Sequence, residues 1–427
     1  MQHDTGGTHM RSTTVRILLL LAVALAAAAL LAACGSGGST GAREESGAPA
    51  AAGSPAPAAT GEPIRIGFDE GFTGFMALDT MLVDHGIRTA LEQIDSQVLG
   101  RPIEYLKADN ASDPVQAVDK ARQLVESDGI VAMLGPMFSP SNAAVTDYLA
   151  RNGGIPSISF MGQPYENMKT ANKLSFIPTG FFSVPGYYLG RYAAGTMGYK
   201  TANVICFEDT ASRGMVDGFK KAFAAGGGKV LSEESVPYDS IDFAPYITTM
   251  PKADCTIYWI FGNASAPFIK QYRDYGVDAP LLALQASCLT EQQLQELGDL
   301  VVGVMGVDYY VNTLDNPLNK QFVEDYRAMW DGEYPNLNSW GGWLAVNLLV
   351  EGLKKTNGDT TPAKLIEAMS TATVDTPSGP YTMASFEDAF TGTGNIYICE
   401  VKKGAERYEW VPVESFEQVR FTDVSAM

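Results

Sequence analysis

The sequence predicts an α/β protein built from two lobes, each with a parallel sheet. Short apolar segments of strand length alternate with longer segments of helical periodicity from Ile64 onward. The alternation pauses at Pro178-Thr179-Gly180 and then begins again, and 427 residues are enough for two or more domains. A repeated strand–helix order implies a parallel sheet with helices on both faces. We therefore expect two similar lobes with a cleft between them.

The first run of elements begins with the strand Ile64–Phe68, which is followed by the turn Gly71-Phe72-Thr73-Gly74. Pro114 is suited to the first position of a helix after Asp113, because the N–H that proline lacks would be unpaired there. The other strands expected in this run are Ile103–Leu106, Ile130–Leu134 and Ile155–Phe160. The helices expected are Ala77–Ile94, one that starts at Pro114, and Asn142–Ala150.

The segment after the third expected strand has the features of an anion site. Ile130–Leu134 is uniformly apolar, which predicts a fully buried parallel strand, and Gly135-Pro136 ends it. Ser139, Ser141 and Asn142 then offer side chains that can cap a helix. The free N–H groups and positive end of such a helix favour a carboxylate. Ligands also bind at the carboxyl ends of strands in open α/β sheets, although an ordinary capped helix with nothing bound fits this pattern equally well.

The second run of elements follows the same order. Its expected strands are Ala202–Phe207, Lys229–Leu231, Thr256–Phe261, Leu281–Gln285 and Val301–Val307. Its expected helices are Tyr187–Met197, Gly214–Ala225, Ala266–Tyr275 and Glu291–Leu297. Three more helices and two strands complete the chain: Pro317–Trp330, Trp340–Lys355, Pro362–Ser370, Asn395–Val401 and Glu409–Val413.

The N-terminus predicts export. Arg11 and Arg16 precede the apolar run Ile17–Ala33, which is a pattern typical of a secretory signal. The next residue, Cys34, makes the end of the run resemble the lipobox of bacterial lipoproteins, in which this thiol is acylated. A membrane-spanning anchor is the alternative, but the run is slightly short for one. We expect residues 1–33 to be a signal peptide and residues 34–61 to be a flexible tether rich in Gly, Ser, Ala and Pro.

Charge and composition exclude several functions. The net charge of −19 and pI of about 4.6 argue against nucleic acid and against an anionic membrane surface as partners, so we expect membrane contact through the lipid anchor only. His3 and His9 fall in the leader, which leaves His85 as the only mature histidine, in a packing or surface role. A multi-histidine metal site is therefore impossible. The sequence contains no phosphate-binding or nucleophile motif, and we expect no metal and no cofactor.

Several motifs resemble those of one protein family. Two motifs follow the expected strands of the first lobe: Asp109-Asn110-Ala111-Ser112-Asp113-Pro114 and Leu134-Gly135-Pro136-Met137-Phe138-Ser139. Three more are Gly154-Ile155-Pro156-Ser157-Ile158-Ser159, Phe207-Glu208-Asp209 and Arg213-Gly214. By their order and spacing, the chain from Ile64 to Val401 resembles the type I periplasmic binding proteins, and most of all the branch that supplies branched-chain amino acids to ABC importers.

The resemblance implies two Rossmann-like lobes that are joined by a three-crossing hinge and close on a ligand. The crossings would fall near Pro178-Thr179, Val307-Asp308 and Ser378-Gly379. Lobe 1 would then comprise residues 62–179 plus 309–378, and lobe 2 residues 180–308 plus 379–427.

The resemblance also implies which residues contact the ligand. Ser139 matches a serine that holds the ligand carboxylate. The loop Met161, Gly162 and Gln163 matches a ligand-binding loop in which a threonine usually stands at the position of Gln163. The other positions implied to line the cleft are Asp79, Phe138, Arg213, Phe261, Gln285 and Asn338.

Two of these positions depart from the family pattern. Gln285 stands where amino-acid binders place an acid against the ligand ammonium, and it cannot neutralise a buried charge. Arg213 stands where a tyrosine is common, and it would attract a second acidic group. One hypothesis is therefore a small carboxylate other than a plain branched-chain amino acid, such as an aromatic, keto or dicarboxylic acid. The alternative is that Arg213 points outward and that Asp79 takes the ammonium.

These observations predict an exported, lipid-anchored binding protein, on the outer face of the cytoplasmic membrane or in the periplasm. We expect it to be a monomer that delivers an amino acid or related organic acid to an ABC permease, and not an enzyme. A protein of the same fold that serves a membrane sensor is the alternative. A carboxylate-based hydrolase is a further, weaker alternative.

Overall fold

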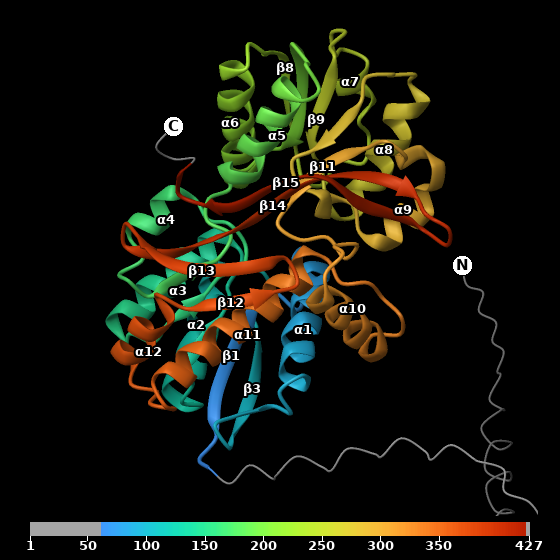
Figure 1. The fold of residues 1–427 in the computed structure, drawn as a ribbon. Helices are drawn as coiled ribbons and strands as arrows, with labels where there is room; N and C mark the ends of the chain where they lie inside the picture. The colour runs from blue at the N-terminus through green and yellow to red at the C-terminus, as the bar shows by residue number, and fades with distance from the viewer. Residues whose placement is uncertain (1–60, 424–427) are drawn as a thin grey trace, which may run out of the picture. The chain divides into compact units, whose positions relative to one another are not determined.

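The computed structural model describes residues 61–423, which form one mixed sheet with helices packed against both of its faces (Figure 1). The strands follow the order β2-β3-β1-β4-β5-β6-β14-β11-β10-β9-β7-β8, and β12, β13 and β15 pair beside this path. The predicted signal peptide and Cys34 lie outside the described residues. The predicted α/β class with a mostly parallel sheet is confirmed.

The first half of the sheet runs from β2 to β6. Its strands are β1 (Ile64–Glu70), β2 (Gln97–Val98), β3 (Arg101–Asp109), β4 (Ala132–Leu134), β5 (Ser157–Ile158) and β6 (Ser175–Ile177). All neighbours are parallel except β2 with β3. The helices of this half are α1 (Ala77–Glu92), α2 (Pro114–Arg122), α3 (Ser139–Arg151), α4 (Tyr165–Lys169), α10 (Pro317–Met329), α11 (Leu337–Lys355) and α12 (Pro362–Met369). A single π-helical turn, η1 (Gln123–Ser127), follows α2.

The second half runs from β11 to β8 and is also parallel. Its strands are β7 (Thr201–Phe207), β8 (Lys229–Val236), β9 (Cys255–Trp259), β10 (Leu281–Ala283) and β11 (Met305–Asp308). Its helices are α5 (Ser183–Gly195), α6 (Thr210–Ala225), α7 (Ala244–Ile247), α8 (Ser265–Asp274) and α9 (Glu291–Leu297), with 3-10 turns at η2 (Gly262–Ala264), η3 (Ala286–Cys288) and η4 (Gly298–Val301).

The long strand β14 (Ala389–Lys403) joins the two halves. Its residues Phe390 and Thr391 pair with β6, whereas Tyr397–Glu400 pair antiparallel with β11. The other C-terminal strands are β12 (Thr373–Thr376), β13 (Gly379–Phe386) and β15 (Tyr408–Arg420). The chain after Gly379 therefore pairs first with β12 and then with β6 of the first half, before β14 carries it across to β11. The lobe boundaries taken from the resemblance stay a prediction.

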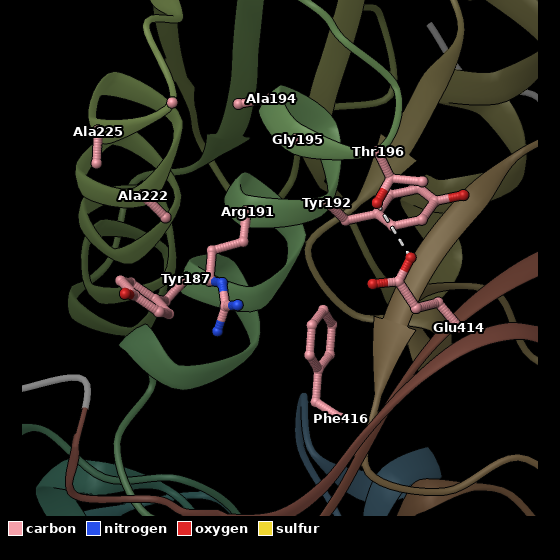
Figure 2. Close-up of a pocket in the computed structure, with 11 residues that line it drawn as sticks. Tyr187, Arg191, Tyr192, Ala194, Gly195, Thr196, Ala222, Ala225, Glu414 and Phe416 are labelled. Atoms are coloured by element: carbon pink, nitrogen blue, oxygen red, sulfur yellow. Dashed lines mark hydrogen bonds between the residues drawn. The ribbon is translucent and has the colours of Figure 1, made fainter.

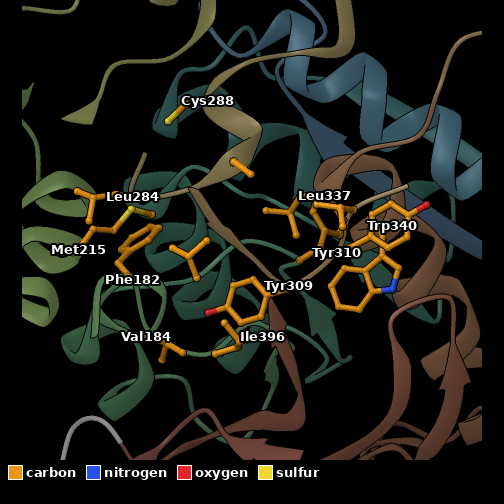
Figure 3. Close-up of a cluster of buried hydrophobic side chains, with 14 of the residues drawn as sticks. Phe182, Val184, Met215, Leu284, Cys288, Tyr309, Tyr310, Leu337, Trp340 and Ile396 are labelled. Carbon is orange, nitrogen blue, oxygen red and sulfur yellow. The ribbon is translucent and has the colours of Figure 1, made fainter. Parts of the chain in front are cut away.

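Hydrogen bonds of buried side chains link the chain crossings, and Tyr309, which makes one of them, lies in a buried hydrophobic cluster (Figure 3). The Tyr309 hydroxyl, after β11, donates to the carbonyl of Thr179 at 2.7 Å. The Ser378 hydroxyl in turn donates to the carbonyl of Tyr309, and the Tyr397 hydroxyl donates to the carbonyl of Ser378 at 2.8 Å. Tyr309 is 2% exposed, so these bonds are shielded from water. The segments that cross between the halves are thus linked to one another through Tyr309.

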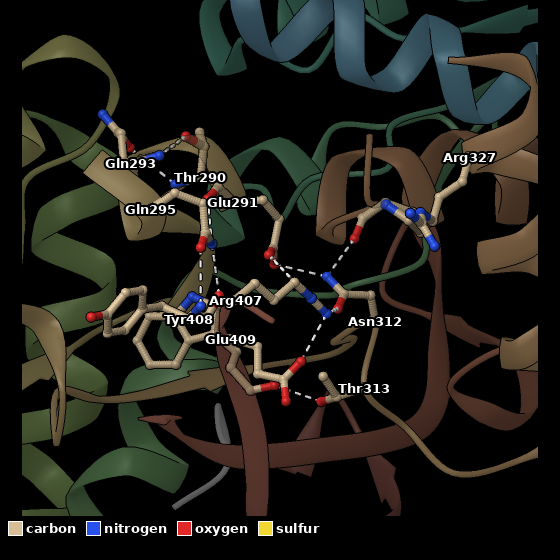
Figure 4. Close-up of polar contacts among 12 residues, drawn as sticks. Thr290, Glu291, Gln293, Gln295, Asn312, Thr313, Arg327, Arg407, Tyr408 and Glu409 are labelled. Atoms are coloured by element: carbon tan, nitrogen blue, oxygen red, sulfur yellow. Dashed lines mark hydrogen bonds and ion pairs between the residues drawn. The ribbon is translucent and has the colours of Figure 1, made fainter. Parts of the chain in front are cut away.

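A second polar cluster fixes the segment that follows β11 (Figure 4). The Arg407 guanidinium forms ion pairs with Glu291 and Glu409 and donates to Asn312 Oδ1 at 2.7 Å. Asn312 Nδ2 donates to Glu291 Oε1 at 2.8 Å and to the Pro335 carbonyl at 3.0 Å. These contacts tie α9, the β14–β15 hairpin and the segment before α10 into one unit.

The start of α3 differs from the sequence prediction. The helix begins at Ser139 instead of Asn142, its N-cap is Phe138, and no side chain caps it. The expected capping by Ser139, Ser141 or Asn142 is wrong. The buried Glu70 carboxylate accepts from the N–H groups of Met137 and Gly71, so a residue of the neighbouring strand β1 holds this loop in place of a local side chain.

The start of α2 is as predicted and allows a direct test. Asp113 is the N-cap of α2, and its Oδ1 accepts from the N–H groups of Val115 and Gln116, each at 2.9 Å. We expect Asp113→Ala to lower the free energy of unfolding by about 1 kcal/mol, whereas Asp113→Asn should change it by only a few tenths because asparagine also caps well. Urea denaturation of both variants measures this, and equal losses would show that the cap hydrogen bonds contribute nothing.

Candidate functional site

A partly buried carboxylate–amide pair lies between two helices of the first half. Asn338 Nδ2 donates to Asp79 Oδ1 at 2.8 Å. The helices α1 and α11 pack so closely that a Cβ added to Gly86 would lie 1.8 Å from the Ser339 carbonyl oxygen. This close approach brings Asp79 and Asn338 together although 259 positions separate them. Burial raises the pKa of Asp79 to about 6, and the Asn338 hydrogen bond opposes part of the shift.

The N-terminus of α3 provides a place for an anion. The first helical hydrogen bond runs from Asn142 N to the carbonyl of Phe138 at 2.8 Å, and the N–H groups before it have no intrahelical partner. Ser139 is partly buried, and its carbonyl accepts from Asn167 Nδ2 at 3.0 Å. The positive end of a 13-residue helix therefore stands at the predicted carboxylate position.

The loop after β5 is held by the side chain of Gln163. Its amide nitrogen donates to the Met137 carbonyl at 2.9 Å and to Ser159 Oγ at 3.0 Å, while its amide oxygen accepts from Asn167. Gln163 is fully buried, so its side chain supports the loop from behind. Met161 and Gly162 lie on the same loop, and the direct ligand contacts predicted for all three residues stay a prediction.

Aromatic rings link the two halves beside these groups. Phe75, in the loop before α1, packs edge-to-face on Phe138 with ring centroids 5.2 Å apart. Phe75 also lies 6.2 Å from Tyr238, which follows β8 in the second half. Tyr238 contacts Phe207 and Phe261 at 4.8 and 6.0 Å. Two of the residues predicted to line the cleft, Phe138 and Phe261, therefore belong to one chain of ring contacts that crosses between the halves.

The end of β10 adds an acceptor without a partner. Gln285 is 3% exposed, and its Oε1 has no hydrogen-bond partner among the described residues. Burial raises the pKa of Cys288, the last residue of η3, and the charges of Asp308 and Asp79 add to the shift. The unpaired amide oxygen of Gln285 is therefore available to a ligand donor.

Two buried acids that are the last residues of their strands were not singled out by the sequence. Burial raises the pKa of Glu70, at the end of β1, to about 7, and it raises the pKa of Asp308, at the end of β11, to about 7. Asp308 accepts from the N–H groups of Ser287 and Tyr309 at 3.0 and 2.9 Å. The sequence signal that could have identified them is an acid at the end of an apolar strand, because such positions lie at the ligand-binding edge of a parallel sheet.

Arg213 lies apart from the buried groups. It is exposed in the first turn of α6, and its guanidinium reaches Thr210 Oγ1 at 3.5 Å. By contrast, Asp79 is partly buried and is paired with the buried Asn338. The geometry thus offers a partly buried anion for a ligand ammonium, a helix N-terminus for a carboxylate, and rings for an apolar group.

The raised pKa of Asp79 predicts a pH dependence. The folded protein keeps this proton up to about pH 6, whereas the unfolded chain loses it near pH 3.8. The resulting stabilisation is complete below the unfolded pKa and is lost as the pH rises through 6. A ligand ammonium needs the ionised carboxylate, so we expect its affinity to fall about tenfold per pH unit below about pH 6. Calorimetric titrations between about pH 5 and pH 8 measure this, and a flat profile in that window would contradict it.

Metal-site geometry, helix hydropathy, His85 and the cysteines bear on the sequence predictions over the described residues. Residues 61–423 contain no group of His, Cys, Asp and Glu that is suited to a metal ion, and no helix in this range has the length and apolarity to cross a bilayer. His85 stacks on Trp330 at 3.7 Å, which confirms its packing role. The four described cysteines are free and buried: Cys206, Cys255, Cys288 and Cys399.

Comparisons with known proteins agree with this geometry. A family model described as "Periplasmic binding protein" matches residues 63–406. The Leu/Ile/Val-binding protein homolog 6 of Brucella melitensis is 25% identical over 363 residues, which cover 83% of this chain and 92% of that protein.

Two solved structures share the fold. A solute-binding protein of an ABC transporter from Rhodopseudomonas palustris, in complex with 3,4-dihydroxybenzoic acid, has a TM-score of 0.77 and 24% identity, covering 84% of this chain and 98% of that one. A branched-chain amino acid transporter substrate-binding protein from Streptococcus pneumoniae, in complex with isoleucine, has a TM-score of 0.71 and 20% identity, covering 82% and 100%.

Proposed function

Because this chain belongs to the periplasmic binding protein family, we propose that it is the lipid-anchored, extracytoplasmic substrate-binding protein of an ABC importer. It binds a small carboxylate-bearing solute between its two lobes and presents the closed form to the permease. It acts as a monomer and carries out no reaction on the solute. Cys34 carries the lipid, and residues 34–61 tether the binding domain to the membrane.

The pairing of Asp79 with Asn338 supports an amine-bearing carboxylate, such as an amino acid, as the ligand. Asp79 supplies the anion that Gln285 does not, because its pKa of about 6 leaves it mostly ionised at neutral pH. The ligand carboxylate then meets the N-terminus of α3 at Ser139. The amide oxygen of Gln285 accepts a hydrogen bond from the same ammonium or from a ligand hydroxyl. In this arrangement Arg213 points outward.

An aromatic acid without an amine is the second candidate. The ring contacts of Phe75, Phe138, Tyr238 and Phe261 favour a flat apolar ligand. One of the similar structures holds 3,4-dihydroxybenzoic acid, whereas another holds isoleucine. In this alternative Asp79 would stay protonated and donate to a ligand oxygen, and Arg213 would attract any second acidic group.

A thermal-shift screen of the purified protein separates the two candidates. The panel holds amino acids, aromatic acids, keto acids, dicarboxylates and amides. A ligand that binds only the folded state raises the midpoint temperature of unfolding when its concentration exceeds its Kd. A shift with amino acids supports the first candidate, in which Asp79 binds the ligand ammonium. A shift only with carboxylates that lack an amine supports the second candidate. No shift with any carboxylate would contradict a small carboxylate ligand.

Arg213→Ala completes the test of ligand class. If leucine binds at micromolar affinity and the variant binds it equally well, Arg213 has no part in recognition and the ligand need not carry a second acidic group. A loss confined to dicarboxylates would instead place Arg213 at the ligand.

A further inference from the structure

Two exposed aromatic rings meet where the halves of the chain approach each other. Phe75 belongs to the first half and Tyr238 to the second, and their ring centroids are 6.2 Å apart, which is within the range of an aromatic contact. Phe75 is nevertheless 57% exposed and Tyr238 is 49% exposed. A contact that leaves so much of each side chain in solvent adds little to folding, because the apolar area that it buries is small. Such a contact can form and break while both halves stay folded.

The backbone of Phe75 is fixed in the first half. It lies in the loop between β1 and α1, and the residues on either side of it hydrogen-bond the loop that follows β3. Thr73 donates from its N–H and from its hydroxyl to the Asp109 carboxylate, at 3.1 and 2.8 Å. Met76 N donates to Ser112 Oγ at 3.2 Å. This loop therefore keeps its place in the first half when the second half moves.

Tyr238 is anchored in the second half in a similar way. It lies two positions after the end of β8, and its ring contacts Phe207 of β7 at 4.8 Å and Phe261, after β9, at 6.0 Å. Phe207 is itself buried and contacts Phe261 at 5.0 Å. Each ring of the pair is thus held by its own half. The distance between Phe75 and Tyr238 therefore depends on how closely the halves approach.

The pair is connected to the proposed ligand groups but carries no charge. The Phe75 ring packs on Phe138, which is the N-cap of α3, and the next residue, Ser139, is the proposed position of the ligand carboxylate. Phe75 also precedes Asp79 by four positions. Because phenylalanine and tyrosine are uncharged at neutral pH, the pair does not neutralise the charged groups of a solute. Its contribution is to the stability of the closed arrangement.

We propose that Phe75 and Tyr238 form the closing contact of the binding cycle and determine how long a bound solute is retained. This inference rests on the proposed function. The contact forms when the halves approach, and it breaks before the solute leaves. Its loss therefore raises the rate of dissociation and changes the rate of association little. Both residues act on the solute through the position of the halves, so they are positioning residues.

The first test requires no solute. The double variant with Phe75→Cys and Tyr238→Cys is treated with a short bismaleimide, and mass spectrometry follows cross-linking within one chain. The four described native cysteines are buried, so they should react slowly. The matched control combines Phe75→Cys with Tyr275→Cys, because Tyr275 is also exposed in the second half but is no ring partner of Phe75 among residues 61–423. We expect the first pair to cross-link at least tenfold faster than the control pair.

The second test measures the dissociation of isoleucine and of 3,4-dihydroxybenzoate, which two of the similar structures hold, by stopped-flow fluorescence. We expect Phe75→Ala and Tyr238→Ala each to raise the dissociation rate about fivefold, as for the loss of one aromatic pair. The double variant should be no faster than either single variant, because both substitutions remove the same contact. Phe416→Ala is the control, because this ring lines a pocket of about 450 Å³ between α5, α6 and β15 to which no proposed ligand residue contributes (Figure 2).

Three results would overturn the proposal. One is a Phe75 and Tyr238 cysteine pair that cross-links no faster than the control pair. Another is an unchanged dissociation rate of a bound probe in both alanine variants. The third is an additive effect in the double alanine variant, which would show that each ring contacts the solute directly. If neither probe binds, the result counts against the proposed function, whereas cross-linking still supports or overturns the contact. Both rings are exposed, so the variants should fold, and circular dichroism verifies this.

Discussion

Replacing Asp79 by asparagine is expected to weaken the binding of an amine-bearing carboxylate about 100-fold, which is about 3 kcal/mol. Asparagine keeps the shape of the side chain, and its amide oxygen still accepts from Asn338 Nδ2. It removes the negative charge, however, and leaves the ligand ammonium buried without an anion. Calorimetric titration of wild type and variant with the amino acid selected by the thermal-shift screen measures the loss.

Asp217→Asn is the control for this experiment. Asp217 is exposed on α6, so its substitution changes the net charge by the same amount without touching the Asp79–Asn338 pair. Amino-acid binding that is equal in both variants would show that Asp79 does not face the ligand. If Asp79→Asn binds aromatic acids as tightly as the wild type does but no longer binds amino acids, the Asp79 carboxylate contacts the ligand ammonium.

Replacing Gly186 by alanine is expected to lower the free energy of unfolding by about 3 kcal/mol, at the upper end of the cost of overpacking. A Cβ at Gly186 in α5 would lie 1.9 Å from the Met215 carbonyl oxygen in α6. The atom in contact belongs to the backbone, so no side-chain rotation can relieve the clash. The two helices would have to move apart along their whole contact.

Gly195→Ala in the same helix is the matched control. No atom lies within 4 Å of a Cβ added there, and alanine favours helix over glycine by about 0.5–1 kcal/mol. Urea denaturation should therefore show one variant that is less stable than wild type and one that is slightly more stable. Equal stability of the two variants would contradict the close packing of α5 on α6.

Local signals in the sequence predicted one helix to the residue and the start of another. The prediction for α9, Glu291–Leu297, is confirmed, and this helix is fixed by a capping box between Thr290 and Gln293. The start of α2 at Pro114 is also confirmed. In both cases the determining contacts are made within four residues, so the sequence contains them directly.

Elements that depend on distant partners were predicted less well. The strands β12 and β13 were not predicted, and β14 is 15 residues long although only Asn395–Val401 was expected. Its first part contains Gly392 and Gly394, which are unfavourable in strands. The strand forms there because β6, β13 and β15 pair with it. Pairing with distant strands therefore determines the conformation of these residues, and no local sequence pattern specifies that pairing.

The candidate site shows the same division. The local pattern placed Ser139 just before a helix, and the family resemblance predicted Asp79 at the cleft. The pairing of Asp79 with Asn338 depends on the packing of α1 on α11. The Gln163 amide hydrogen-bonds Met137 and Ser159, and these bonds depend on how the loops after β4 and β5 fold together. Neither contact follows from spacing.

The hydrogen bonds at Tyr309 determine how many ways the two halves can move. Three separate connections would allow twisting, sliding and opening as independent motions. Because Tyr309 joins the carbonyl of Thr179 and the hydroxyl of Ser378, displacement of one connection strains the others. We expect one soft coordinate, a rotation about an axis near Tyr309, with the remaining motions stiff. Ligand binding then has to select a position along a single degree of freedom, and it loses little entropy in doing so.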